Sequence, residues 1–71
     1  MLATIQAVKS TMRNKAAKLA KASGENAIIY QGEQGKRVTQ MITTESAWNS
    51  CPNKIKVVFL AKVDENGNNV D

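Results

Sequence analysis

Apolar residues in the first twenty positions recur at the spacing of an α-helix. Successive members are three or four residues apart, and at 100° per residue they fall on an arc of about 120°, which is typical of a helix that packs one face on a partner. These positions are Leu2, Ile5, Val8, Met12, Ala16 and Leu19. Lys18 and Lys21 lie where cations complement a helix dipole, and Gly24 suits a left-handed terminus. The sequence therefore predicts an N-terminal helix that ends near Gly24.

The start of this helix is less clear from the sequence. Thr4 can cap a long helix, but β-branched residues within positions 2–8 also permit a strand there, with Ser10 capping a shorter helix. A start at Ser10 places Arg13 in the first turn, where the helix dipole is positive, with no acid to offset it. We therefore favour the longer helix.

After Gly24 the pattern changes to short runs that are typical of strands. "NAIIYQ" at 26–31 and "KRVTQMITT" at 36–44 flank "GEQG", which we interpret as a hairpin loop. "TTESAWNSCPN" is rich in cap and turn residues, so it is a loop or a single helical turn capped by Thr43 or Thr44. "KIKVVFLAKV" at 54–63 is the strongest strand signal. We predict one α+β domain over residues 1–71: an N-terminal basic amphipathic helix on a three-stranded antiparallel sheet, in the order α-β-β-β, with room for a short helical turn before the last strand.

The predicted last strand has an unusual second face. Strict alternation places one wholly apolar set against the helix, namely Ile55, Val57, Phe59, Ala61 and Val63. The other face carries Val58 and Leu60 between Lys56 and Lys62, which implies partial cover on the side away from the helix; Ile29 and Met41 join it in some registers. We consider two interpretations: a small cluster closed by the loop that contains Trp48, or a dimer or partner surface formed by Val58, Leu60 and Trp48.

The positive charge is concentrated in the first third of the chain. The net charge is +4, yet residues 1–24 contain five basic residues and no acid. These are Lys9, Arg13, Lys15, Lys18 and Lys21. A solvated helix face is one interpretation, but such faces usually intersperse Glu with Lys at four-residue spacing. The absence of acids favours a surface for nucleic-acid phosphates or for an acidic protein.

The composition excludes most catalytic and metal chemistry. The chain has no histidine and a single cysteine, Cys51, so an intrachain disulfide is excluded and zinc ligands are lacking. No histidine is present to activate Cys51, and the six carboxylates form no recognisable acid–base pair. No apolar run approaches the ~20 residues that a membrane span needs, and no signal peptide is evident. We expect no enzyme, no metal, no cofactor, no membrane association and a cytoplasmic location.

These observations lead to two functional hypotheses. The first is a small non-enzymatic binding protein whose basic helix engages a polyanion, most simply the backbone of nucleic acid without sequence specificity. The alternative is an accessory or inhibitor protein of the phage or mobile-element type, which binds a host protein through the outer sheet face and Trp48. A homodimer through that face is also an open alternative.

Overall fold

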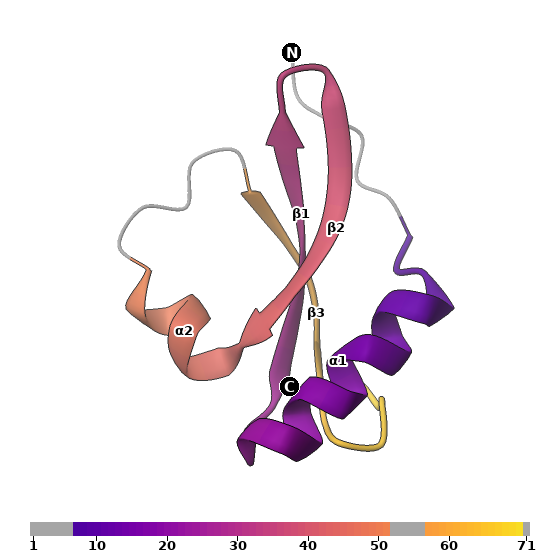
Figure 1. Cartoon of the computed structure of the whole chain (residues 1–71), viewed down its shortest axis with the longest axis vertical. Coiled ribbons are helices and arrows are strands. Elements are labelled where there is room, and N and C mark those ends of the chain that lie inside the picture. The colour runs from indigo at the N-terminus through magenta and orange to yellow at the C-terminus, as the bar shows by residue number, and fades with distance from the viewer. Residues whose placement is uncertain (1–6, 52–56, 71) are drawn as a thin grey trace.

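The computed structural model describes residues 7–51 and 57–70. In chain order the elements are α1 (Ser10–Ser23), β1 (Ala27–Gln34), β2 (Arg37–Thr44), α2 (Glu45–Ser50) and β3 (Val57–Val63). The three strands form one antiparallel sheet in the order β2-β1-β3. Figure 1 shows the β1–β2 turn at the upper end of the sheet and both helices below it. This arrangement confirms the predicted α+β fold with its helix first, and it includes the short helix before the last strand.

The N-terminal helix begins at Ser10, so the preferred longer helix is wrong at residues 7–9. Lys9 is extended, its amide donates to Oε1 of Gln40 at 3.1 Å, and Nε2 of Gln40 donates to the Ala7 carbonyl. These bonds hold the stretch against β2 instead of in a helix. The rest of the disputed segment, residues 2–6, lies outside the described residues.

Arg13 is stabilised in the first turn of α1 without any acid. Its Nη1 donates to the Gly67 carbonyl at 3.1 Å and to Oδ1 of Asn69 at 2.7 Å. The turn that follows β3 brings these acceptors to the helix; Asp64 shapes that turn by accepting from the amides of Asn66 and Asn68. The objection to a start at Ser10 fails because a segment over fifty residues away supplies oxygen acceptors for the guanidinium.

The apolar stripe of α1 packs on the sheet as predicted. Ala16 and Ala20 are buried against Ala27 and Ile29 of β1 and Val63 of β3. The partly buried residues around this centre are Val8, Met12, Leu19, Ile42, Leu60 and Ala61. The helix ends where Gly24 adopts a φ of 76° and its amide bonds to the Ala20 carbonyl, as the sequence indicated. Leu2 and Ile5 of the predicted stripe lie outside the described residues.

The hairpin is tighter than the predicted "GEQG" loop. β1 and β2 pair as far as Gln34 opposite Arg37, which leaves only Gly35 and Lys36 in the turn, with a φ of 62° at Gly35. Gly32 lies within β1 rather than in the loop. The terminal methyl of Met41 occupies the space where a side chain at position 32 would begin, so this glycine makes room for Met41.

A register shift between β1 and β3 reverses part of the predicted face assignment. Ile29 pairs with Ala61, whereas the next residue of β1, Tyr30, pairs with Phe59, so Leu60 is the extra residue of a bulge. Ala61 and Val63 face α1 as predicted. For residues 57–60 the predicted faces are wrong. The extra residue of a bulge shifts the alternation by one, so the side chains before it point to the opposite faces from those expected. Leu60 packs against the α1 core, while Phe59 faces away from it and is exposed.

The first turn of α2 attaches this helix to the face of the sheet opposite α1. Thr44 Oγ1 accepts from the Ala47 amide at 3.2 Å, which matches one of the two predicted caps. Oε1 of Glu25 accepts from the Ser46 amide at 2.6 Å. The Glu45 amide donates to the Asn26 carbonyl at 3.0 Å, and its carboxylate forms a salt bridge of 3.0 Å with Lys62. Short as it is, α2 is therefore linked to the residues that precede β1 and to β3.

The link through Glu25 predicts an acid-sensitive attachment of α2. The hydrogen bonds from the Ser46 amide and side chain lower the pKa of Glu25 below its ordinary value. A lowered folded-state pKa contributes stability that is complete above the ordinary pKa and is lost as the pH falls through the folded-state pKa. We expect the melting temperature of Glu25→Gln to lie below that of the wild type at pH 7, and we expect the difference to shrink as the pH falls below the ordinary pKa of a glutamate. Circular dichroism melting measures this difference.

Glu65→Gln is the matched control, because Glu65 is an exposed carboxylate in the turn after β3. It is expected to retain the wild-type dependence on pH. Trp48, the one tryptophan of the chain, lies in α2, so its fluorescence emission reports on the same helix directly. A gap between wild type and Glu25→Gln that persists unchanged at pH 3 would contradict the role of this carboxylate.

Candidate functional site

Three lysines of α1 form a row on the side of the helix that faces solvent. Lys15, Lys18 and Lys21 follow one another at three-residue intervals, which places neighbouring Cβ atoms about 5–6 Å apart. All three are exposed, while Ala16 and Ala20 are buried. We call these three residues the lysine row. Because the buried stripe fixes the rotation of the helix, the row spreads over about 120° of the helix surface that the sheet does not cover.

The charge of the lysine row is not compensated within the described part of the chain. The only salt bridge among the described residues joins Lys62 to Glu45, on the other face of the sheet. The first turn of α1 contains no acid, and Lys21 lies in the last turn. Row lysines are therefore available to an external anion without first breaking an ion pair to a described residue.

The other two basic residues predicted for this site lie apart from the row. Arg13 is half-buried and bonded to the turn that follows β3. The turn packs closely on the helix, because a Cβ added to Gly67 would lie 3.7 Å from Arg13 Cγ and from Ala17 Cβ. It therefore has a structural role. Lys9 is exposed but precedes the first turn, and its amide is bonded to β2. The structure thus brings together three of the five predicted residues.

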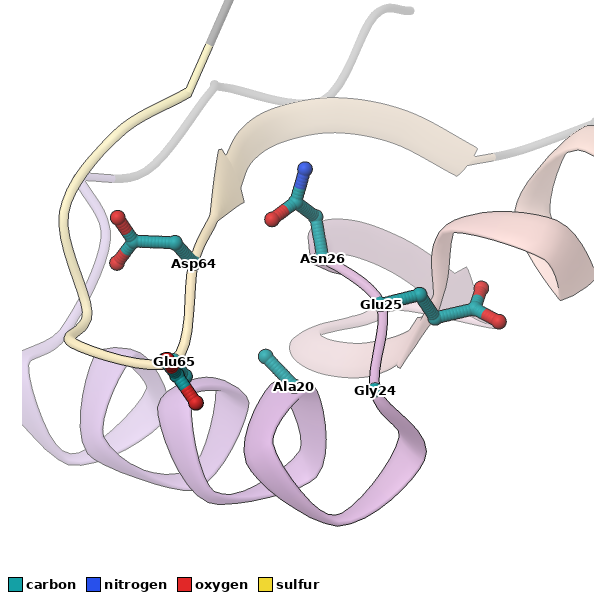
Figure 2. A pocket seen from close by; sticks show the side chains of 6 residues that line it. All are labelled: Ala20, Gly24, Glu25, Asn26, Asp64 and Glu65. Carbon is teal, nitrogen blue, oxygen red and sulfur yellow. The ribbon is translucent and has the colours of Figure 1, made fainter.

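A small acidic hollow lies beyond the C-terminal end of α1. It has a volume of about 250 Å³ and is lined by Ala20, Gly24, Glu25, Asn26, Asp64 and Glu65. Figure 2 shows the carboxylates of Glu25 and Asp64 pointing in opposite directions, and each accepts backbone hydrogen bonds elsewhere. Among the described residues no cluster of three carboxylate, cysteine or histidine side chains is placed to hold a metal.

Three aromatic rings gather on the face of the sheet away from α1. The Trp48 ring of α2 lies between Tyr30 of β1 and Phe59 of β3, with centroid distances of 5.3 Å and 6.2 Å. Phe59 is 50% exposed, and it is the one large apolar side chain exposed within residues 7–51 and 57–70. We call these three residues the aromatic face.

The protein interface predicted from the sequence is not assembled as expected. Trp48 does lie on the outer face, but Leu60 is partly buried against the core under α1, and Val58 pairs with the buried Gln31 on the α1 side. Phe59 takes the place that was expected for Leu60. Sequence reasoning missed Phe59 because strict alternation places it inside, and no residue of "VVFLAKV" marks the position of the bulge.

Neither the family models, nor the curated proteins, nor the solved structures with which the chain was compared match it. In the described part of the chain, neither helix has the length and hydrophobicity needed to cross a bilayer. Any statement about function therefore depends on the two surfaces described above, the lysine row and the aromatic face.

Proposed function

We propose that the protein is a small non-enzymatic binding protein whose lysine row contacts the phosphates of nucleic acid. The observation that supports this most directly is the row itself: Lys15, Lys18 and Lys21 are exposed, evenly spaced and form no ion pair with any residue of 7–51 or 57–70. Several lysines on one straight element suit a ligand with regularly repeated negative charge. Such contacts supply affinity without reading sequence.

Direct reading of bases by α1 has little support. Arg13, one of the few side chains of α1 able to form paired hydrogen bonds to a base, is engaged by Gly67 and Asn69. Of the residues around the row, only Asn14 combines exposure with an amide side chain. We therefore expect affinity through α1 to be similar for all sequences and to fall steeply with salt.

The test replaces the lysine row with glutamine, in the variant Lys15→Gln/Lys18→Gln/Lys21→Gln. Each lost phosphate contact on a duplex flattens the plot of log affinity against log salt by about 0.9, so the triple variant should flatten it by up to about 2.7. The fold should survive, because all three side chains are exposed. Duplex titrations at several salt concentrations measure the slope, and circular dichroism checks the fold.

A matched control compares single charges. Lys18→Gln should reduce the slope by about 0.9, whereas Lys36→Gln, at the exposed turn of the β1–β2 hairpin, should leave it unchanged. Wild-type protein that binds no duplex near about 50 mM salt contradicts the proposal. Row-dependent capture of one stoichiometric protein from a nuclease-treated lysate would assign the row to an acidic partner instead.

The alternative function, an accessory or inhibitor protein that binds a host protein, depends on the outer face and Trp48. The residues expected to form that surface, Val58 and Leu60, lie on the α1 side of the sheet. Among the described residues, what remains for a protein partner on the outer face is the exposed Phe59 beside Trp48. We therefore prefer the lysine row as the primary site.

A further inference from the structure

Phe59 is an exposed aromatic ring, whereas the other large apolar side chains of the described residues are buried or partly buried. Half of its surface is open to solvent, although it lies in the middle of a strand and beside Trp48. The planes of the two rings are inclined by 52°, so they do not stack face to face. A ring held at the surface in this way has area available for a flat ligand.

The rings around Phe59 are held in place before any ligand arrives. Trp48 is carried by α2, whose first turn bonds to Glu25 and Asn26 and whose Glu45 pairs with Lys62. Tyr30 lies in the central strand and contacts Trp48 at a centroid distance of 5.3 Å. Such pre-organisation lowers the entropic cost of binding a planar group.

The charges near this face suit an anionic ligand. Arg37 lies four residues from Met41 on β2, so alternation places both on the side of Tyr30, about 13 Å apart along the strand. Arg37 is exposed. The nearby carboxylates are engaged, Glu45 by Lys62 and Glu25 by the start of α2. A phosphate at Arg37 would therefore meet no uncompensated carboxylate among the described residues of this face.

The small exposed area distinguishes a base from a protein partner. A specific protein interface buries about 800 Å² on each side and depends on several anchoring side chains. The described part of this face offers one exposed large apolar side chain, Phe59. A nucleobase needs only one ring face, and such stacking changes affinity by on the order of 10- to 100-fold per base.

We propose that the aromatic face stacks the bases of single-stranded nucleic acid, with Phe59 as the principal platform and Arg37 beside the backbone. The inference deepens the proposed function and rests on it, because it gives the same class of ligand a second surface. That surface accepts single strands only, since the bases of a duplex are already stacked on one another. The lysine row, in contrast, accepts phosphates from either form.

Phe59→Leu tests this proposal, because leucine retains an apolar side chain at the site and removes the aromatic ring. A short single-stranded oligopyrimidine should change the emission of Trp48 in the wild type. Phe59→Leu should bind the same strand 10- to 100-fold more weakly, while its affinity for a duplex stays at the wild-type value. Phe59→Tyr should restore binding of the single strand, since it restores the ring. Circular dichroism confirms that each variant is folded.

The outcomes separate this inference from the proposed function. Unchanged single-strand affinity in Phe59→Leu overturns the aromatic face and leaves the lysine row intact. Loss of single-strand affinity in Phe59→Leu supports the aromatic face. If the triple lysine variant at the same time binds a duplex like the wild type, the row is contradicted. A wild type that binds neither form overturns both. A wild-type dimer in sedimentation that Phe59→Leu dissociates overturns the aromatic proposal and identifies the face as a protein interface.

Discussion

Leu60→Asp is expected to leave the protein largely unfolded at 25 °C. Leu60 packs against the core formed by α1 and the sheet, so the change removes apolar contacts, which costs about 2–5 kcal/mol for large-to-small core substitutions. It also places a carboxylate against that core, where the charge would lose part of its hydration. A chain of 71 residues has a total stability of roughly 4–10 kcal/mol. Aspartate is preferred to lysine because a lysine side chain is long enough to reach solvent.

Phe59→Asp is the matched control, with the same new charge one residue earlier. Phe59 is half exposed, so its carboxylate would be hydrated, and the expected loss of about 1–2 kcal/mol comes from contact with Trp48. Circular dichroism melting compares the two variants. Strict alternation along β3 predicts instead that Phe59→Asp is the more destabilised of the two variants. A folded Leu60→Asp together with an unfolded Phe59→Asp would show that the bulge after Ile29 is absent.

Ile29→Ala should have the second largest effect on stability. Ile29 lies in the central strand, is fully buried and packs against Ala16 and Ala20 of α1. The methyl side chains of those alanines cannot reorient into the vacated space, so much of the cavity should persist. We expect a loss of about 3–5 kcal/mol in the free energy of unfolding, measured by urea denaturation.

Ile42→Ala provides the comparison for this cavity. Ile42 is the cross-strand partner of Ile29 on the same face, but it lies on the edge strand and is only half-buried. Its truncation should cost less than half as much, because solvent can enter the space and less apolar area was buried. Equal losses at the two positions would show that Ile29 is not the more deeply buried residue of the pair.

Local patterns identified most of the elements correctly. The stripe of α1 was predictable from Met12, Ala16 and Leu19, because helical spacing and burial coincide when a helix has one partner. Its end was predictable from Gly24, since glycine adopts positive φ at little cost. The lysine row also follows from helical spacing once the buried stripe is known.

Contacts between distant residues decided what the local patterns did not. The start of α1 depends on the bonds of Gln40 to residues 7 and 9 and on the acceptors that Gly67 and Asn69 supply to Arg13. No window of neighbouring residues contains those partners. The role of Arg13 was misjudged for the same reason: its charge suggests a binding residue, whereas its position beside the last turn makes it a structural one.

By itself, the sequence determined the fold class, because the order of local patterns along the chain gives it. It also determined the buried face of α1 and the excess positive charge along its exposed side, because each depends on residues within one element. The tertiary structure alone decided which side chains of β3 lie on which face. A single extra residue at Leu60 is invisible in a continuous apolar run, and it exchanges Phe59 and Leu60 between core and surface. The aromatic face exists for that reason: the pairing of three strands, not the alternation within one, sets the direction of each side chain.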